Sequence, residues 1–119
     1  MIITAQFLTD KFLIVKTRTM AVYYIGSYDI IDMAEFQNYP PGVMALLPKY
    51  GGEVMASDVE AISLEGKPRT MNAIVKFPSR EAALGFYHDP EYQGNIRPIR
   101  IRSTENCTMI LVKEFTKPA

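Results

Sequence analysis

The stretch Thr70–Tyr87, TMNAIVKFPSREAALGFY, changes from a strand-like to a helix-like pattern at Pro78. Its first half, Thr70–Phe77, is rich in residues that favour β-structure and predicts a strand. Ser79 suits the N-cap of the following helix, and Glu81 would lie in the first turn, where the helix dipole favours an acidic side chain. The stretch therefore predicts a strand that leads directly into a helix.

The flanking sequence adds further elements on both sides of this joint. The prolines at 40 and 41 divide one helical region in two, and the glycines at 51 and 52 end it. The elements that we expect, in chain order, are a strand over Met20–Tyr28, helical pieces over Asp32–Asn38 and Pro41–Tyr50, short strands over Glu53–Ser57 and Val59–Leu64, the strand Thr70–Phe77, helices starting at Ser79 and Asp89, and a strand over Cys107–Phe115. With the short candidates Glu53–Ser57 and Val59–Leu64 counted as one strand position, the order is βαββαβ. This order predicts a ferredoxin-like α+β fold, a four-stranded antiparallel sheet with both helical regions on one face.

Composition narrows the class of protein. The chain has 119 residues, with 13 basic and 13 acidic side chains, one histidine and one cysteine. This length suits one domain, which we place at residues 20–119. A net charge of zero argues against a nucleic-acid binder. One cysteine and one histidine at no metal-ligand spacing predict no disulfide framework, no metal and no cofactor.

The N-terminal segment, residues 1–19, has two interpretations. Polar residues interrupt its apolar runs, so it fits neither a signal peptide nor a membrane span, and we expect a cytoplasmic protein without a membrane partner. It is either a native β-hairpin of Ile2–Leu8 and Phe12–Thr17 or an addition upstream of a start at Met20; we favour the addition, ordered as an extra edge strand.

Apolar side chains occupy both faces of the first and last strands. Val22 and Tyr24 would share one face with Met20, and Tyr23 and Ile25 the other. An antiparallel sheet with one wet face should instead alternate apolar and polar residues. Because the helices cover only one face, the pattern predicts a homodimer formed sheet against sheet. Alternatively, the N-terminal hairpin folds over the sheet face that the helices leave uncovered.

The chain from Met20 to Phe115 resembles the bacterial family called domain of unknown function 1330. The resemblance rests on MAVYYIGSYDI, LLPKYGGEV, ISLEG, VKFPSREAALGFYHDPEYQ and MILVKEF. It implies a dimeric α/β barrel, in a superfamily that also holds cofactor-free monooxygenases, haem-degrading enzymes and lactone isomerases. The chain departs from the family pattern at Glu53, where Arg is common, and fits it loosely over Gly94–Arg102.

Two side chains are candidates for catalysis. His88 carries an imidazole, the side chain most often used as a general base, and could act as one, although it more simply interacts with carbonyl groups at a helix end. Tyr24 lies on a strand expected at the centre of the sheet, where its hydroxyl could hold a phenolic or enolic ligand. Cys107 has neither a positive neighbour nor a helix N-terminus in the sequence, so we interpret it as a small buried hydrophobe.

Six side chains are candidates for ligand binding. Tyrosine hydroxyls and an amide at the centre of a sheet must bond one another or face a wet cavity. Arginines three residues apart share a helix face and could clamp a carboxylate or phosphate, although a solvated face is the plainer interpretation. The candidates are Tyr24, Tyr28, Asn72, Tyr92, Arg97 and Arg100.

Two functional hypotheses follow. The first is a cytoplasmic bacterial homodimer that binds a small, partly aromatic or acidic metabolite, as a binder or as a cofactor-independent enzyme of the monooxygenase or isomerase type. The second is a non-catalytic dimeric module whose interior is fully packed. A cavity that touches Tyr24, Asn72 or Arg100 would favour the first.

Overall fold

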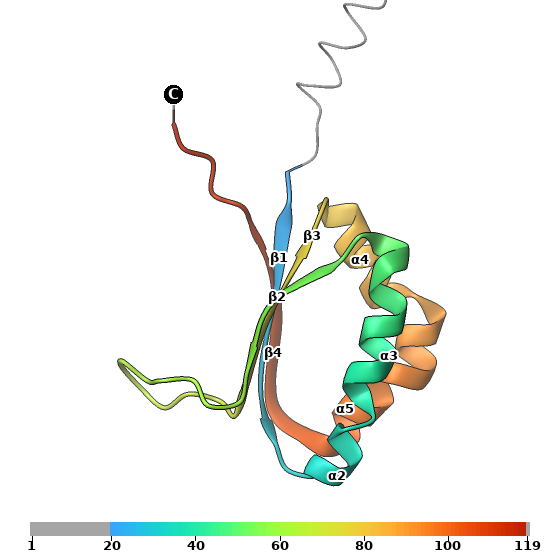
Figure 1. Cartoon of the computed structure of the whole chain (residues 1–119), viewed down its shortest axis with the longest axis vertical. Coiled ribbons are helices and arrows are strands. Elements are labelled where there is room, and N and C mark those ends of the chain that lie inside the picture. The colour runs from blue at the N-terminus through green and yellow to red at the C-terminus, as the bar shows by residue number, and fades with distance from the viewer. Residues whose placement is uncertain (1–19, 119) are drawn as a thin grey trace, which may run out of the picture.

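The computed structural model describes residues 20–118, so both interpretations of Met1–Thr19 concern residues outside the described part of the chain. One antiparallel sheet has the order β2-β3-β1-β4. Its strands are β1 (Val22–Ile30), β2 (Glu53–Asp58), β3 (Met71–Phe77) and β4 (Thr104–Lys113). The strands predicted at the centre, β1 and β3, are the central pair, and every helix lies on one side of the sheet (Figure 1).

Strand register separates the two faces. Tyr24 is opposite Val75 on β3 and Leu111 on β4, and these side chains face the helices. Ile25 is opposite Ile74 and Ile110, on the outer face. The structure thus confirms that the first and last strands, β1 and β4, carry apolar residues on both faces.

Local signals explain most of the helix layer. The side chains of Asp32 and Ser79 accept hydrogen bonds from the backbone amides of Glu35 and Ala82, so the predicted N-cap at Ser79 is confirmed and Asp32 is the N-cap of the first helical piece. Gly51 ends the first helical region with φ of 69°, a left-handed conformation that favours glycine. The helical elements are α2 (Met33–Phe36), α3 (Tyr39–Leu46), η1 (Leu47–Tyr50), α4 (Arg80–His88), η2 (Tyr92–Ile96) and α5 (Arg97–Ser103).

Three prolines lie inside the helix layer. Pro40 and Pro41 lie in the first turn of α3, where their missing amide hydrogens cost nothing, so the predicted break falls just before Tyr39. Pro98 lies near the start of α5, directly after the π-helical turn η2. Its missing amide hydrogen removes a hydrogen bond that a regular α-helix would make there, and the helical region continues through the irregular turn.

The prediction of a strand over Val59–Leu64 is wrong. The chain from 59 to 70 is a loop that projects away from the body of the protein (Figure 1), and Leu64 is 92 % exposed. β2 already pairs with β3 from Glu53 to Asp58, so Val59–Leu64 has no strand beside it. β-Favouring residues form a strand only where a partner strand supplies hydrogen bonds.

The core lies between the sheet and the helices and is mainly aromatic. Phe77 and Tyr92 are fully buried, and the Phe86 ring lies 5.5 Å from Phe77 and 4.9 Å from Tyr92, centroid to centroid. Offset contacts of this kind add to the free energy gained from burial. The aromatic residues thereby join α4, η2 and β3.

Asp89 joins η1 to the connection between α4 and η2. Its carboxylate accepts hydrogen bonds from the Tyr50 hydroxyl, the Lys49 ammonium and the Glu91 amide. The hydrogen bonds from Tyr50 and then from Lys49 and Glu91 lower the pKa of Asp89 to about 2. The predicted helix start at Asp89-Pro90 therefore also holds two elements together.

We expect Asp89→Asn to lower the melting temperature by several degrees at pH 7. A carboxylate whose pKa is depressed on folding stabilises the protein above its unfolded pKa, near 4, and this contribution is lost as the pH falls towards 2. The variant should therefore lose stability less steeply between about pH 4 and pH 2. Circular dichroism melts between pH 7 and 2 measure this, with Asp58→Asn on the exposed edge strand as control; parallel curves for wild type and Asp89→Asn would contradict it.

Candidate functional site

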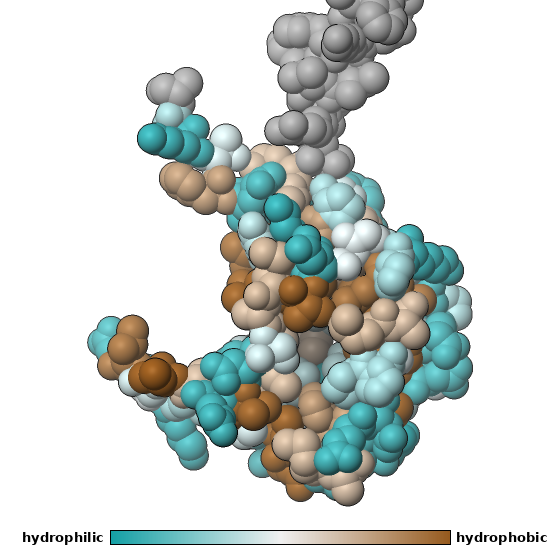
Figure 2. All heavy atoms as spheres, in the orientation of Figure 1, coloured by the Kyte–Doolittle hydropathy of each residue, from teal (hydrophilic) through white to brown (hydrophobic). Residues whose placement is uncertain are grey.

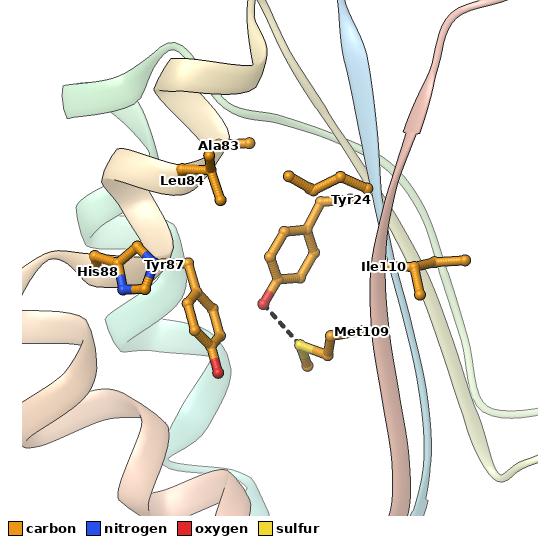
Figure 3. A pocket seen from close by; sticks show the side chains of 8 residues that line it. Tyr24, Ala83, Leu84, Tyr87, His88, Met109 and Ile110 are labelled. Atoms are coloured by element: carbon orange, nitrogen blue, oxygen red, sulfur yellow. Dashed lines mark hydrogen bonds between the residues drawn. The ribbon is translucent and has the colours of Figure 1, made fainter.

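A cavity of about 310 Å³ lies between α4 and the strands β1 and β4. Apolar residues gather where the sheet meets the helix layer (Figure 2). The side chains of Tyr24, Met109, Tyr87 and His88 surround the space, whereas the Ile110 side chain points away from it (Figure 3). The lining residues are Tyr24, Ala83, Leu84, Tyr87, His88, Met109, Ile110 and Leu111.

The helix layer leaves this space because it covers β4 unevenly. α4 packs on β1 and β3, whereas α5 contacts β4, which it directly precedes in the chain. The pairs Ala83–Tyr87 and Leu84–His88 are four residues apart on α4 and present one face to the cavity. One wall is thus a helix face, and the opposite wall is the strand pair β1–β4.

Both catalytic candidates of the sequence, Tyr24 and His88, line this cavity. The Tyr24 hydroxyl donates to the Met109 sulfur over 2.7 Å. Burial, with the nearby Tyr92, raises the pKa of Tyr24 far above its ordinary value, so the hydroxyl keeps its proton and suits a donor rather than a base. The rings of Tyr87 and His88 lie edge to face with centroids 5.3 Å apart.

Three ligand-binding candidates meet deeper in the same layer. Tyr28, Tyr92 and Arg100 join Tyr39 to form a cluster, which we call the tyrosine–arginine cluster. The hydroxyls of Tyr39 and Tyr92 are 2.7 Å apart, and the Arg100 guanidinium lies 6.0 Å from the ring centroids of both Tyr28 and Tyr39. Burial raises the pKa of Tyr28 and Tyr39, so both hydroxyls are neutral at physiological pH.

A smaller cavity, of about 70 Å³, lies between this cluster and the first cavity. It shares Tyr24 and Met109 with the first cavity, and Tyr28 and Tyr39 with the cluster. A third hollow of about 250 Å³ lies between α3 and the strands β2 and β3, and its wall is mostly apolar. The predicted contact of a cavity with Tyr24 is therefore present, but these three cavities do not include Asn72 or Arg100 in their walls.

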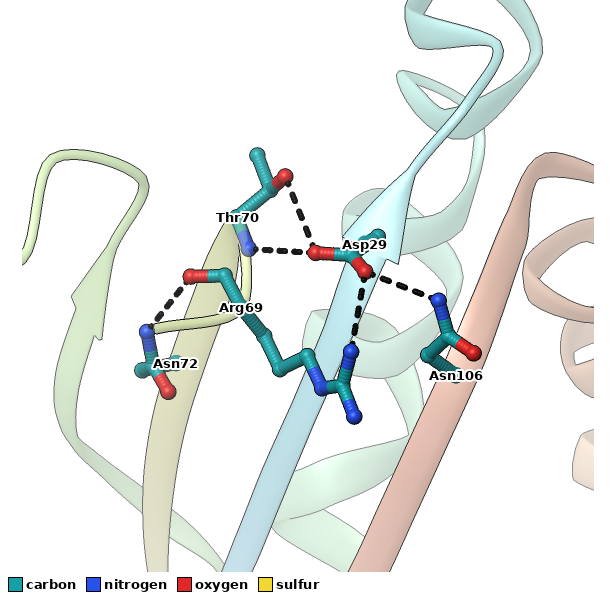
Figure 4. Close-up of polar contacts among 5 residues, drawn as sticks. All are labelled: Asp29, Arg69, Thr70, Asn72 and Asn106. Atoms are coloured by element: carbon teal, nitrogen blue, oxygen red, sulfur yellow. Dashed lines mark hydrogen bonds and ion pairs between the residues drawn. The ribbon is translucent and has the colours of Figure 1, made fainter. Parts of the chain in front are cut away.

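Asn72 lies apart from the other candidates, on the outer face of the sheet. Its side chain accepts from the Ser27 hydroxyl. It also donates to the Arg69 carbonyl (Figure 4). Beside it, the Asp29 carboxylate accepts from Thr70, Asn106 and Arg69, and the hydrogen bond from Asn106 contributes most to lowering its pKa. This group ties the end of β1 to β3 and β4.

Arg97 also lies outside the tyrosine–arginine cluster as defined, although it shares α5 with Arg100. It is half-buried, and its Nε atom is buried without a hydrogen-bond partner in the described part of the chain. None of the three cavities includes it.

The prediction that Cys107 is buried is wrong. Its side chain is exposed on β4, and its sulfur accepts a hydrogen bond from Nη1 of Arg100 over 3.1 Å. The positive neighbour that was not evident in the sequence is seven residues away, at the other side of the α5–β4 turn. Sequence reasoning also missed Tyr39, Tyr87 and Met109; only Tyr87 carried a signal, as the first residue of the YHDPEY motif.

Comparison with known proteins identifies the family of the chain. The model of the family described as domain of unknown function (DUF1330) matches residues 21–115. The chain belongs to the DUF1330 family. No protein of curated function matches it.

Two solved structures share the fold with this DUF1330 chain. A protein of unknown function from Rhodopseudomonas palustris, 16 % identical, superposes with a TM-score of 0.71 over 84 % of this chain and 86 % of its own. A protein of unknown function from Bacteroides fragilis, described as dimeric and ferredoxin-like, is 13 % identical, with a TM-score of 0.57 over 79 % of this chain and 96 % of its own. The predicted ferredoxin-like α+β fold is confirmed.

Two features are absent from residues 20–118. In this range, no helix combines the length and apolar character needed to cross a bilayer. The same residues contain no group of three His, Cys, Asp or Glu side chains placed to hold a metal ion.

The buried pair Tyr39–Tyr92 predicts strong energetic coupling. Tyr39→Phe or Tyr92→Phe alone leaves a buried hydroxyl without its partner and should cost about 1–2 kcal/mol of unfolding free energy. The double variant should cost clearly less than the sum, because no orphaned hydroxyl remains. Urea denaturation of the four proteins measures this cycle; additive costs would show that the two hydroxyls are not coupled.

Proposed function

We propose that this DUF1330 protein is a cytoplasmic bacterial homodimer that binds a small, partly aromatic or acidic metabolite in each subunit. The observation that carries the proposal is the 310 Å³ cavity whose wall combines apolar side chains with the Tyr24 hydroxyl and the His88 imidazole. Binding sites for small molecules are typically concave and apolar, with a few polar groups that orient the ligand. The single cysteine, which offers no disulfide framework, suits a reducing compartment.

The outer face of the sheet supports the dimer. Ile25 lies between Ile74 and Ile110, and Tyr23 and Val112 extend this row into an apolar patch. Ile110 is 54 % exposed in the single subunit. A second copy would cover the patch by self-complementary contact, and a chain of zero net charge meets no long-range repulsion. The Bacteroides fragilis neighbour is itself described as dimeric.

The chemistry of the cavity supports a cofactor-independent enzyme of the monooxygenase or isomerase type, as the wider superfamily resemblance suggests. The neutral Tyr24 hydroxyl can donate to a developing enolate or phenolate oxygen. His88 is the single histidine of the sequence and lies in the opposite wall, on α4, as the candidate general base. The ligand would lie between these groups, with its apolar part against Leu84 and Leu111.

A non-catalytic dimeric module is the second candidate, and one observation favours it. The Tyr24 hydroxyl is hydrogen-bonded to Met109, and the hydroxyls of Tyr39 and Tyr92 are hydrogen-bonded to each other. These polar groups are therefore satisfied within the chain and need no ligand.

Substitution on the outer face tests the dimer. Ile110→Glu places a charge at the centre of the proposed interface, where burial without a partner is unfavourable, and should convert the dimer to monomer at micromolar concentration. Ile101→Glu, at a similarly exposed position on α5, is the matched control and should remain dimeric. Light scattering gives the mass; a wild-type protein with the mass of one chain would refute the dimer.

Filling the cavity tests the binding site. Leu84→Trp puts an indole at the wall of the 310 Å³ cavity and should weaken binding of a neutral aromatic probe, benzyl alcohol, at least tenfold. Leu64→Trp, in the exposed loop, is the control and should leave binding unchanged. Ligand-observed NMR measures both. A wild type that binds no probe would favour the packed, non-catalytic module.

A further inference from the structure

Arg100 is a buried cation without an acidic partner in the described part of the chain. It is 3 % exposed, and its Nε atom has no hydrogen-bond partner. The ion pairs within residues 20–118 are Lys49–Asp89, Arg69–Asp29 and Arg102–Glu35. All three acidic side chains are thus paired with other cations, and Arg100 is left with neutral neighbours.

The neutral neighbours compensate only part of the cost of burying a charge. Nη1 donates to the Cys107 sulfur, a weak acceptor, and the rings of Tyr28 and Tyr39 lie at the outer limit of cation–π distance. Buried guanidinium groups are ordinarily paired with carboxylates, because an unpaired buried charge destabilises the fold. A binding role for the arginine accounts for an unpaired cation at this position.

The cavity and Arg100 both lie against β4. Leu111 and Met109 line the cavity, and Cys107, two residues before Met109 at the irregular start of β4, contacts the guanidinium. Residues two apart on a strand are separated by about 7 Å. The charge therefore lies about one side chain beyond the inner wall of the cavity, within the reach of a small ligand.

Met109 occupies the position between the cavity and Arg100. Its sulfur accepts from the Tyr24 hydroxyl, and these two side chains separate the 310 Å³ cavity from the 70 Å³ cavity beside Tyr28 and Tyr39. Methionine has three rotatable bonds and changes shape at small cost. A shift of Met109 would join the two cavities and release the Tyr24 hydroxyl to a ligand.

We infer that the ligand of this site is a carboxylate, with its acid group paired to Arg100 past Met109 and its apolar part in the 310 Å³ cavity. The inference rests on the proposed function, since it uses the same cavity. A planar guanidinium binds a carboxylate through two parallel hydrogen bonds, and Nε is free to make one of them. A single cation in an otherwise neutral cluster matches a single negative charge.

Binding of two probes of similar size tests the charge. Benzoate and benzyl alcohol differ chiefly in the carboxylate, and wild type should bind benzoate at least tenfold more tightly in ligand-observed NMR titrations. Arg100→Met removes the charge while keeping much of the side-chain volume, so it should lose this preference and still bind benzyl alcohol. Arg102→Met on the same helix, whose side chain pairs with Glu35 at the surface, should keep the preference.

Stability without ligand supplies an independent readout. If Arg100 is retained for binding, Arg100→Met should leave the melting temperature of the free protein unchanged or raise it by about 2–5 °C. Benzoate should raise the melting temperature of wild type but not that of the variant. A fall of several degrees in the free variant would show that Arg100 holds the fold together, and would overturn the inference.

The outcomes separate this inference from the proposed function. Equal binding of both probes to wild type overturns the carboxylate and leaves the cavity as a binding site. Binding of neither probe overturns both. If Arg100→Met does not fold, Arg100 holds the fold together and the inference is overturned. Arg100→Lys gives a second readout: it keeps the charge, so a retained preference for benzoate at lower affinity supports the inference, and a lost preference overturns it.

Discussion

One layer of helices covers one face of a four-stranded sheet whose central strands are apolar on both faces, and this constraint shapes the rest of the protein. On the inner face, aromatic side chains of α4 and η2 pack on β1 and β3 and bury Phe77 and Tyr92 completely. α4 does not extend over the middle of β4, so the same packing leaves the cavity beside Met109. On the outer face, Ile25, Ile74 and Ile110 form a row that the chain's own helices cannot reach.

The inner layer is unusually rich in hydroxyl and charged groups for a small core. The tyrosines at 24, 39 and 92 place aromatic surface in the interior and bring polar groups with it. Each of these hydroxyls has a partner, Met109 for Tyr24 and the facing tyrosine for the other two, so their burial costs little. Arg100 differs, because its nearest groups are neutral. Among residues 20–118, the buried side-chain atoms without a hydrogen-bond partner are Nε of Arg97 and Nε of Arg100. Arg100 is the more deeply buried of the two, and it locates the proposed ligand.

Sequence reasoning succeeded where structure depends on neighbours in the chain. The caps Asp32 and Ser79, the turn at Gly51 and the strand Thr70–Phe77 are set by short-range hydrogen bonds and backbone preferences. It failed at Val59–Leu64, where suitable residues lack a partner strand, and at Cys107, whose exposure depends on how α5 leads into β4. Of the candidate site, Tyr24 and His88 share the cavity, while Asn72 lies on the opposite face of the sheet.

The amino-acid sequence by itself determined the order of strands and helices, the fold class and the apolar character of both sheet faces, because periodicity and capping are local properties. Only the tertiary structure decided which polar groups meet. The contacts Tyr39–Tyr92 and Tyr24–Met109 join residues 53 and 85 positions apart, and the three ion pairs leave Arg100 out. Spacing along the chain carries no information about such distant contacts, since they arise from the packing of one layer on another. The sequence could therefore name Arg100 as a candidate, but its burial without an acidic partner is a property of the fold.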